Sequence, residues 1–127
     1  MAILNGGINV NISCKCGAPP EERPIIYRGS TPTIILSFEN EELNFQDIIA
    51  CRIIMANDDD RNKKIFNNPT IDREQETISI ELSQQDTLGF AYGNLNLQAK
   101  IKLQNERVTI GDGPVMLVKK TLDETVI

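Results

Sequence analysis

Alternation of apolar and polar residues between Thr77 and Leu103 is the strongest structural signal in the chain. A first run carries apolar side chains at every second position, namely Ile78, Ile80 and Leu82. A second run repeats the pattern with Leu95, Leu97, Ala99, Ile101 and Leu103. A period of two puts successive side chains on opposite faces of a strand, so one face is dry and the other contacts water. Because such half-wet strands are typical of antiparallel sheets, the pattern predicts an antiparallel β domain.

Shorter apolar patterns predict further strands on both sides of this region. Alternation from Ile8 to Cys16 predicts an early strand, and others are expected over residues 33–38, 48–55, 64–66, 107–110 and 115–118. Residues 48–55 are nearly continuously apolar, which favours a strand that is covered on both sides or placed centrally. Together these make about seven to eight short strands separated by turn-forming residues, a cadence typical of an all-β sandwich. A chain break is expected at residues 111–114, where two glycines and a proline occur.

The segment between the two alternating runs has helical character. Ser83 followed by Asp86 resembles the capping box that begins a helical turn. Leu88 and Phe90 are expected to fold back beneath the end of the sandwich as an apolar plug. This segment is interpreted as structural.

A proline-rich stretch divides the chain near its start. Pro19, Pro20 and Pro24 disfavour regular structure and favour an extended surface linker. We therefore expect residues 1–23 to hold an N-terminal strand and linker, and residues 24–127 to form the sandwich domain.

Length and charge restrict the class of protein. With 127 residues and 40% hydrophobic content, the chain is expected to fold as one domain around its own core. The net charge of −5 argues against sequence-independent binding of nucleic acid, which needs clustered positive charge. No apolar run reaches the roughly 18 residues of a membrane-spanning helix. The first residues lack a signal-peptide pattern, so synthesis in a cytoplasm is expected.

The cysteine and histidine counts restrict the chemistry. The chain has no histidine, which excludes Ser–His–Asp and Cys–His nucleophiles and histidine-ligated metals. Cys14, Cys16 and Cys51 are expected to be free thiols that behave as small apolar residues, with a bridge to Cys51, a bridge between subunits or an adventitious metal as alternatives. Aspartates 58–60 and Asp112 could supply calcium ligands, but no calcium-loop spacing is present, and we favour the explanation that tight turns require these residues. We expect no catalytic residues, no cofactor and no metal.

Sugar binding is the main alternative to a purely structural role. The chain has no tryptophan, and aromatic residues make up 5% of it. Phe38 and Phe90 occupy apolar positions and are expected in the core. Tyr27 and Tyr92 flank turns, where they could be exposed.

Four segments, in order, resemble structural proteins of tailed bacteriophages and prophages of Gram-positive bacteria. They are residues 27–34 (YRGSTPTI), 78–90 (ISIELSQQDTLGF), 93–101 (GNLNLQAKI) and 122–127 (LDETVI). The layout is similar to the immunoglobulin-like N-terminal domain of phage baseplate upper proteins. The resemblance covers the chain from about Tyr27 onward. Related short proteins usually begin close to the segment that corresponds to Arg28 and Gly29, whereas here a strand and a proline-rich linker precede it.

The resemblance implies an immunoglobulin-like sandwich and a non-enzymatic place in the virion, in the tail, baseplate or head–tail region. It implies other virion structural proteins as partners, in a homo-oligomer or larger particle, with neither nucleic acid nor membrane. A carbohydrate- or host-surface-binding module is the alternative. Residues proposed for the interface lie on the early strand, beside turns and near residue 127; they are Ile8, Val10, Ile12, Tyr27, Arg28, Tyr92, Val126 and Ile127. We expect the early strand to pack in its own sandwich, and addition to a neighbouring subunit is the alternative.

Overall fold

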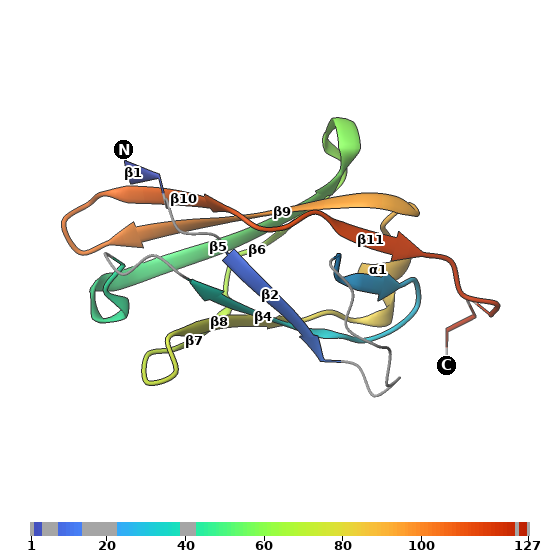
Figure 1. Ribbon diagram of the computed structural model, residues 1–127, viewed down its shortest axis with the longest axis horizontal. Helices are drawn as coiled ribbons and strands as arrows, with labels where there is room; N and C mark the ends of the chain where they lie inside the picture. Colours follow the sequence, from blue (N-terminus) through green and yellow to red (C-terminus); the bar gives the residue numbers. More distant parts are fainter. Residues whose placement is uncertain (1, 4–7, 14–22, 39–42, 124, 127) are drawn as a thin grey trace.

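Two β-sheets pack face to face in the computed structural model (Figure 1). The structure describes residues 2–3, 8–13, 23–38, 43–123 and 125–126, and for residues 2–3 and 8–13 it describes the backbone alone. The two sheets enclose one apolar core. This arrangement confirms the predicted all-β sandwich.

Sheet A is built around β9, the longest strand. Its seven strands are β1 (Ala2–Ile3), β3 (Ile25–Tyr27), β5 (Ile48–Asn57), β6 (Arg61–Phe66), β9 (Gly93–Leu103), β10 (Val108–Asp112) and β11 (Met116–Lys119). One edge of β9 pairs with β5, which in turn pairs with β6. The other edge is shared by β10 and β11, which follow one another along it. The placement of β5 between two partners agrees with the central position, one of the two expectations for residues 48–55. The other expectation, cover on both sides, is wrong, because Ile49, Ala50 and Arg52 are exposed.

Two pairs in sheet A depart from the predicted antiparallel arrangement. β1 runs parallel to β10, and β3 runs parallel to β11. A parallel pair needs a long crossover between its strands, and here almost the whole sandwich supplies that crossover. Such long-range pairing leaves no trace in local polarity, which explains why the alternation did not reveal it.

Sheet B is antiparallel throughout. Its strands are β2 (Ile8–Ser13), β4 (Thr33–Phe38), β7 (Thr70–Asp72) and β8 (Thr77–Glu81), in the order β2-β4-β8-β7. The backbone of β2 pairs with β4, opposite residues 33–38. The early strand therefore lies in the sandwich of its own chain. Both β3 and β7 have only three residues, too few for a periodic pattern, and neither was predicted.

The core is formed by the dry faces of the alternating strands. On β9, Leu95, Leu97, Ala99 and Ile101 are buried. The side chains between them, from Asn96 to Lys100, are exposed. On β8 and β4, Ile78, Ile80, Ile34 and Leu36 face the same core. The alternation thus predicted correctly which side of each strand is dry.

A capped helix, α1 (Gln84–Leu88), closes one end of the sandwich. The Ser83 hydroxyl accepts a hydrogen bond from the Asp86 amide at 3.1 Å, and the Asp86 carboxylate accepts one from the Ser83 amide at 2.9 Å. Phe90 is buried in the core, and Leu88 is half-buried. These contacts confirm the predicted capping box and apolar plug. Two short 3-10 turns, η1 (Phe45–Asp47) and η2 (Asp58–Asp60), complete the described elements.

The chain break expected at residues 111–114 begins later than predicted. Gly111 and Asp112 continue β10 and pair with Ala99 and Gln98. β10 ends at Asp112, and the Gly113 amide donates one more hydrogen bond to the Leu97 carbonyl of β9 at 2.9 Å. A Cβ atom on Gly113 would lie 2.8 Å from a methyl carbon of Leu97. Gly113 therefore lets the backbone approach β9 closely, whereas Gly111 does not end the strand.

Candidate functional site

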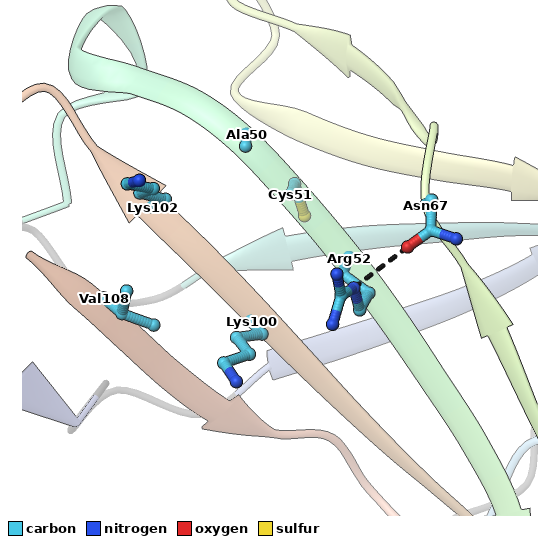
Figure 2. Close-up of a pocket in the computed structure, with 7 residues that line it drawn as sticks. All are labelled: Ala50, Cys51, Arg52, Asn67, Lys100, Lys102 and Val108. Atoms are coloured by element: carbon cyan, nitrogen blue, oxygen red, sulfur yellow. Dashed lines mark hydrogen bonds between the residues drawn. The ribbon is translucent and has the colours of Figure 1, made fainter. Parts of the chain in front are cut away.

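Three basic side chains gather on the outer face of sheet A (Figure 2). Arg52 lies on β5 directly opposite Lys100 on β9, and Lys102 follows two positions along the same strand. Ala50 and Val108 both pair with Lys102, one from each side. Arg52, Lys100 and Lys102 are called the cationic face below.

A shallow hollow of about 380 Å³ lies on this face. It is lined by Ala50, Cys51, Arg52, Asn67, Lys100, Lys102 and Val108. The strand register explains the mixture of basic and apolar lining, because alternate residues of β5, β9 and β10 all point outward here. An irregularity in the pairing between Ile48 and Ala50 leaves Ile49 and Ala50 both exposed at the rim. The hollow can receive an extended segment with both acidic and apolar side chains.

The charges of the cationic face are only partly balanced by neighbours. The Lys102 ammonium lies 3.1 Å from a carboxylate oxygen of Glu106, and Arg52 Nε donates to the neutral Asn67 Oδ1 at 2.9 Å. Like charges directly opposite on neighbouring strands are destabilising, and Arg52 and Lys100 form such a pair. A chain with net charge −5 thus concentrates positive charge where the sheet itself gains nothing from it.

Cys51 lies beneath this face and does not offer a reactive thiol. Its side chain is buried in the core cluster. Burial raises its pKa to about 11, an effect only partly offset by a backbone hydrogen bond at Arg52. At neutral pH the thiol is protonated, and the thiolate is the nucleophilic form. Cys51 is free, whereas Cys14 and Cys16 lie outside the described residues.

The aspartate-rich turn η2 uses its first carboxylate to fix the turn against β9. Asp58 accepts hydrogen bonds from the side-chain amides of Asn94 and Asn96, both at 3.1 Å. Asp59 and Asp60 have positive φ angles of 63° and 58°, a conformation that aspartate tolerates better than most residues. Within the ranges that the structure describes, no group of three or more Cys, Asp or Glu side chains is placed to hold a metal ion.

Three of the predicted interface residues lie at the end of the sandwich that α1 closes. The Arg28 guanidinium lies over the ring of Tyr92, 5.7 Å from its centroid, and Nη2 donates to the Leu88 carbonyl at 3.0 Å. Tyr92 is 59% exposed. Tyr27 is half-buried at the end of β3, where its carbonyl accepts a hydrogen bond from the Ser30 hydroxyl. The fold brings Arg28 and Tyr92 together, although 64 positions separate them in the sequence.

The other predicted interface residues are spread over the molecule. Val126 is 54% exposed in the segment after β11. The backbones of Ile8, Val10 and Ile12 pair with Phe38, Leu36 and Ile34 in sheet B, and their side chains lie outside the described residues, as does Ile127.

A second hollow, of about 540 Å³, lies between two strand edges on one side of the sandwich. It is lined by Ile65, Phe66, Asn67, Asn68, Thr70, Ser79, Ile80 and Glu81. The short strand β7 pairs with residues 77–79 of β8 and leaves Ile80 and Glu81 without a partner from β7. Such an edge is a common place for contact with another chain.

No family model matches the chain, and no curated protein matches it. Among solved structures, the soluble domain of PmoD from Methylocystis sp. ATCC 49242 (Rockwell) is similar, with a TM-score of 0.59 and 12% identity over 94% of this chain and 98% of that one. A 1.5-MDa bacterial ice-binding adhesin, described for host cell surface retention, has a TM-score of 0.50 and 12% identity; the match covers 91% of this chain and 33% of that one. At these identities the likeness shows the fold alone. In the part of the chain that the structure covers, no helix is long and apolar enough to cross a membrane.

Sequence reasoning did not identify the cationic face. The alternating run has Lys100 and Lys102 at its polar positions, but nothing in the run connects these two lysines to Arg52. The connection depends on the register between β5 and β9, in which Arg52 stands opposite Lys100. The alternation of β9 supplies the outward direction of the two lysines, so the missing information was the partner strand.

Proposed function

We propose that this protein is a non-enzymatic structural subunit of a tailed-phage or prophage virion that acts through subunit–subunit contacts. Its place would be the tail, baseplate or head–tail region, after synthesis in the cytoplasm of the bacterial host. The observation that carries the proposal is the cationic face, a sheet surface on which the like charges of Arg52 and Lys100 lie side by side next to apolar lining at Ala50 and Val108. The ordered resemblance of four segments to phage structural proteins supports the virion as the setting.

A contact surface of this kind suits an assembly of many copies. One shallow hollow supplies modest affinity, but a particle repeats the same contact under symmetry, so the combined strength far exceeds that of one pair. The uncovered edge at Ile80 and Glu81 offers a second place for a neighbour. The partners are expected to be other virion structural proteins or further copies of this chain.

The test is to locate the protein in particles. Virions, or particles induced from the prophage, are purified from the organism that encodes this chain and examined by mass spectrometry and cryo-electron microscopy. We expect the chain at a fixed stoichiometry and density for its sandwich in the tail, baseplate or neck. Its complete absence from purified particles, while it is abundant in the lysate, contradicts the proposal.

A carbohydrate- or host-surface-binding module is the second candidate. It is favoured by Tyr92, an exposed aromatic ring with Arg28 held over one face. A glycan array probed with the labelled protein tests it: a hit that Tyr92→Ala removes and Tyr27→Phe retains supports sugar binding. An array without a hit removes this candidate.

A further inference from the structure

We infer that the cationic face is the docking site for residues 121–126 of a second copy of this chain, in a head-to-tail contact. This inference rests on the proposed function and names the partner of the contact. The exposed Asp123 of one copy would lie against Arg52 and Lys100 of the next, and the sequence supplies a second carboxylate in Glu124. Leu122 would lie against the apolar lining at Ala50.

The segment after β11 has the composition that the hollow requires. Leu122 is fully exposed and Val126 is more than half exposed, so two large apolar side chains contact water on one short stretch. Asp123 stands between them and is exposed as well. The hollow presents the complementary set, basic side chains on apolar lining. Covering both surfaces removes apolar area from water and pairs opposite charges.

The segment is attached to the sandwich at its base, so it is presented in a restricted direction. The Thr121 hydroxyl donates to the Arg28 carbonyl at 3.2 Å and to the Asp123 carbonyl at 3.0 Å. The Asp123 carboxylate accepts a hydrogen bond from the Thr125 amide at 2.9 Å. A segment that is ordered before binding loses less conformational entropy when it docks.

The segment cannot reach the cationic face of its own copy. Asp123 follows Lys119, the end of β11, by four positions and therefore lies within about 14 Å of it even when fully extended. Val118 pairs with Gly93, and Lys100 lies seven positions further along β9, roughly 24 Å away at the rise of an antiparallel strand. In Figure 1 the segment after β11 leaves the sandwich at the end opposite the β9–β10 turn. The contact is thus between different surfaces of two copies, which builds a ring or an open filament.

The aspartate-rich turn η2 is a less suitable occupant. Asp58 already accepts two hydrogen bonds from β9, and the turn is followed directly by Arg61 and by Lys63. The residues next to its three carboxylates are polar, so it offers nothing to the apolar lining of the hollow.

Binding of a labelled peptide with the sequence of residues 119–127 to the full chain tests the inference. Fluorescence anisotropy is expected to show saturable binding. Because the contact is largely electrostatic, binding should weaken at least tenfold between 50 and 500 mM salt, a range over which the screening length changes roughly threefold. The chain carrying Arg52→Glu and Lys100→Glu should bind at least tenfold more weakly. The peptide with Asp123→Lys and Glu124→Lys should recover binding to that variant.

The matched control carries Arg61→Glu and Lys63→Glu, which change the net charge by the same amount at exposed positions on β6. It should bind the peptide like the unchanged chain. Milder variants, Arg52→Gln and Lys100→Gln, provide the same comparison if the reversals impair folding. Equal binding to all variants, no binding at millimolar peptide, or no recovery with the reversed peptide overturns the inference. If the peptide fails while the chain is present in virions, only the inference is lost; if the peptide binds while the chain is absent from virions, only the proposed function is lost.

Discussion

The two halves of β9 differ in how well the polar side chains around them are paired. Around its first half, Asn57 is buried with its side chain fully hydrogen-bonded: it donates to the carbonyls of Ala91 and Asn94, and accepts from the Ala91 amide and from Asn62. Around its second half, Lys100 stands beside Arg52 with like charge. The first half shows polar groups that hold the fold together. The second half carries charge that the fold does not use, which is why it is the better candidate for function.

Substitution of Asn57 by Ala breaks the first half most severely. The change removes a buried side chain and with it the hydrogen-bond partner of backbone groups of Ala91 and Asn94, in bonds that are partly buried. We expect a loss of about 2 to 5 kcal/mol in the free energy of unfolding, measured by urea titration. Asn68→Ala, at an exposed position after β6, is the control and should change stability little. If Asn57→Ala loses no more stability than Asn68→Ala, Asn57 does not hold this part of the fold together.

The pH dependence of stability tests the buried position of Cys51, beneath the second half of β9. Burial raises the pKa of Cys51 from 9.0 to about 11, so the unfolded chain releases this proton first as the pH rises. The contribution of the protonated Cys51 thiol to the free energy of unfolding is therefore fully present below pH 9 and is lost as the pH rises through 11. At about 1.4 kcal/mol for each pH unit, the loss is on the order of 2 to 3 kcal/mol. Urea titrations at a series of pH values measure it, and Cys51→Val should flatten this part of the profile.

Removal of the Asp58 carboxylate has a smaller effect on the first half. Asp58→Ala deletes the acceptor of both the Asn94 and Asn96 side chains, which are exposed and can bond to water instead. We expect a loss of about 1 kcal/mol by thermal or urea unfolding. Glu74→Ala, in an exposed turn, is the control. No difference between the two variants would mean that Asp58 does not fix the turn.

Neutralisation of Lys100 should affect stability in the opposite direction. Lys100→Gln relieves the like-charge pair with Arg52, and we expect a gain of roughly 0.2 to 1 kcal/mol at low salt. The gain should shrink at 1 M salt because screening already weakens the repulsion. A loss of stability at low salt would show that Lys100 supports the fold, and the contrast between the two halves of β9 would fail.

Much of the sandwich could be predicted from local patterns. The dry face of β9, from Leu95 to Ile101, and the capping box at Ser83 and Asp86 both depend on residues a few positions apart. Their physical cause is contained in the period of the strand and in the first turn of the helix. Such features are visible in the sequence because they need no distant partner.

The rest depends on which strands lie side by side. The parallel pairing of β3 with β11 joins residues about 90 positions apart, and the three residues of β3 show no period. The like-charge pair of Arg52 and Lys100 likewise arises from register between distant strands. Tyr92 was correctly placed beside a turn, but its position under Arg28 required the fold. The candidate site could therefore be predicted only in its separate parts.

The parallel pairing of β3 with β11 has a mechanical consequence. Pulling on the chain before β3 and after β11 draws the two strands in opposite directions along their length. The rungs from Ile25 to Tyr27 then resist sliding together, aided by hydrogen bonds from Leu117 to Pro24 and from Arg28 to Lys119. Strands that are peeled apart lose their rungs one at a time, whereas these must rupture at once. Tension of this kind would meet its strongest resistance where β3 and β11 meet.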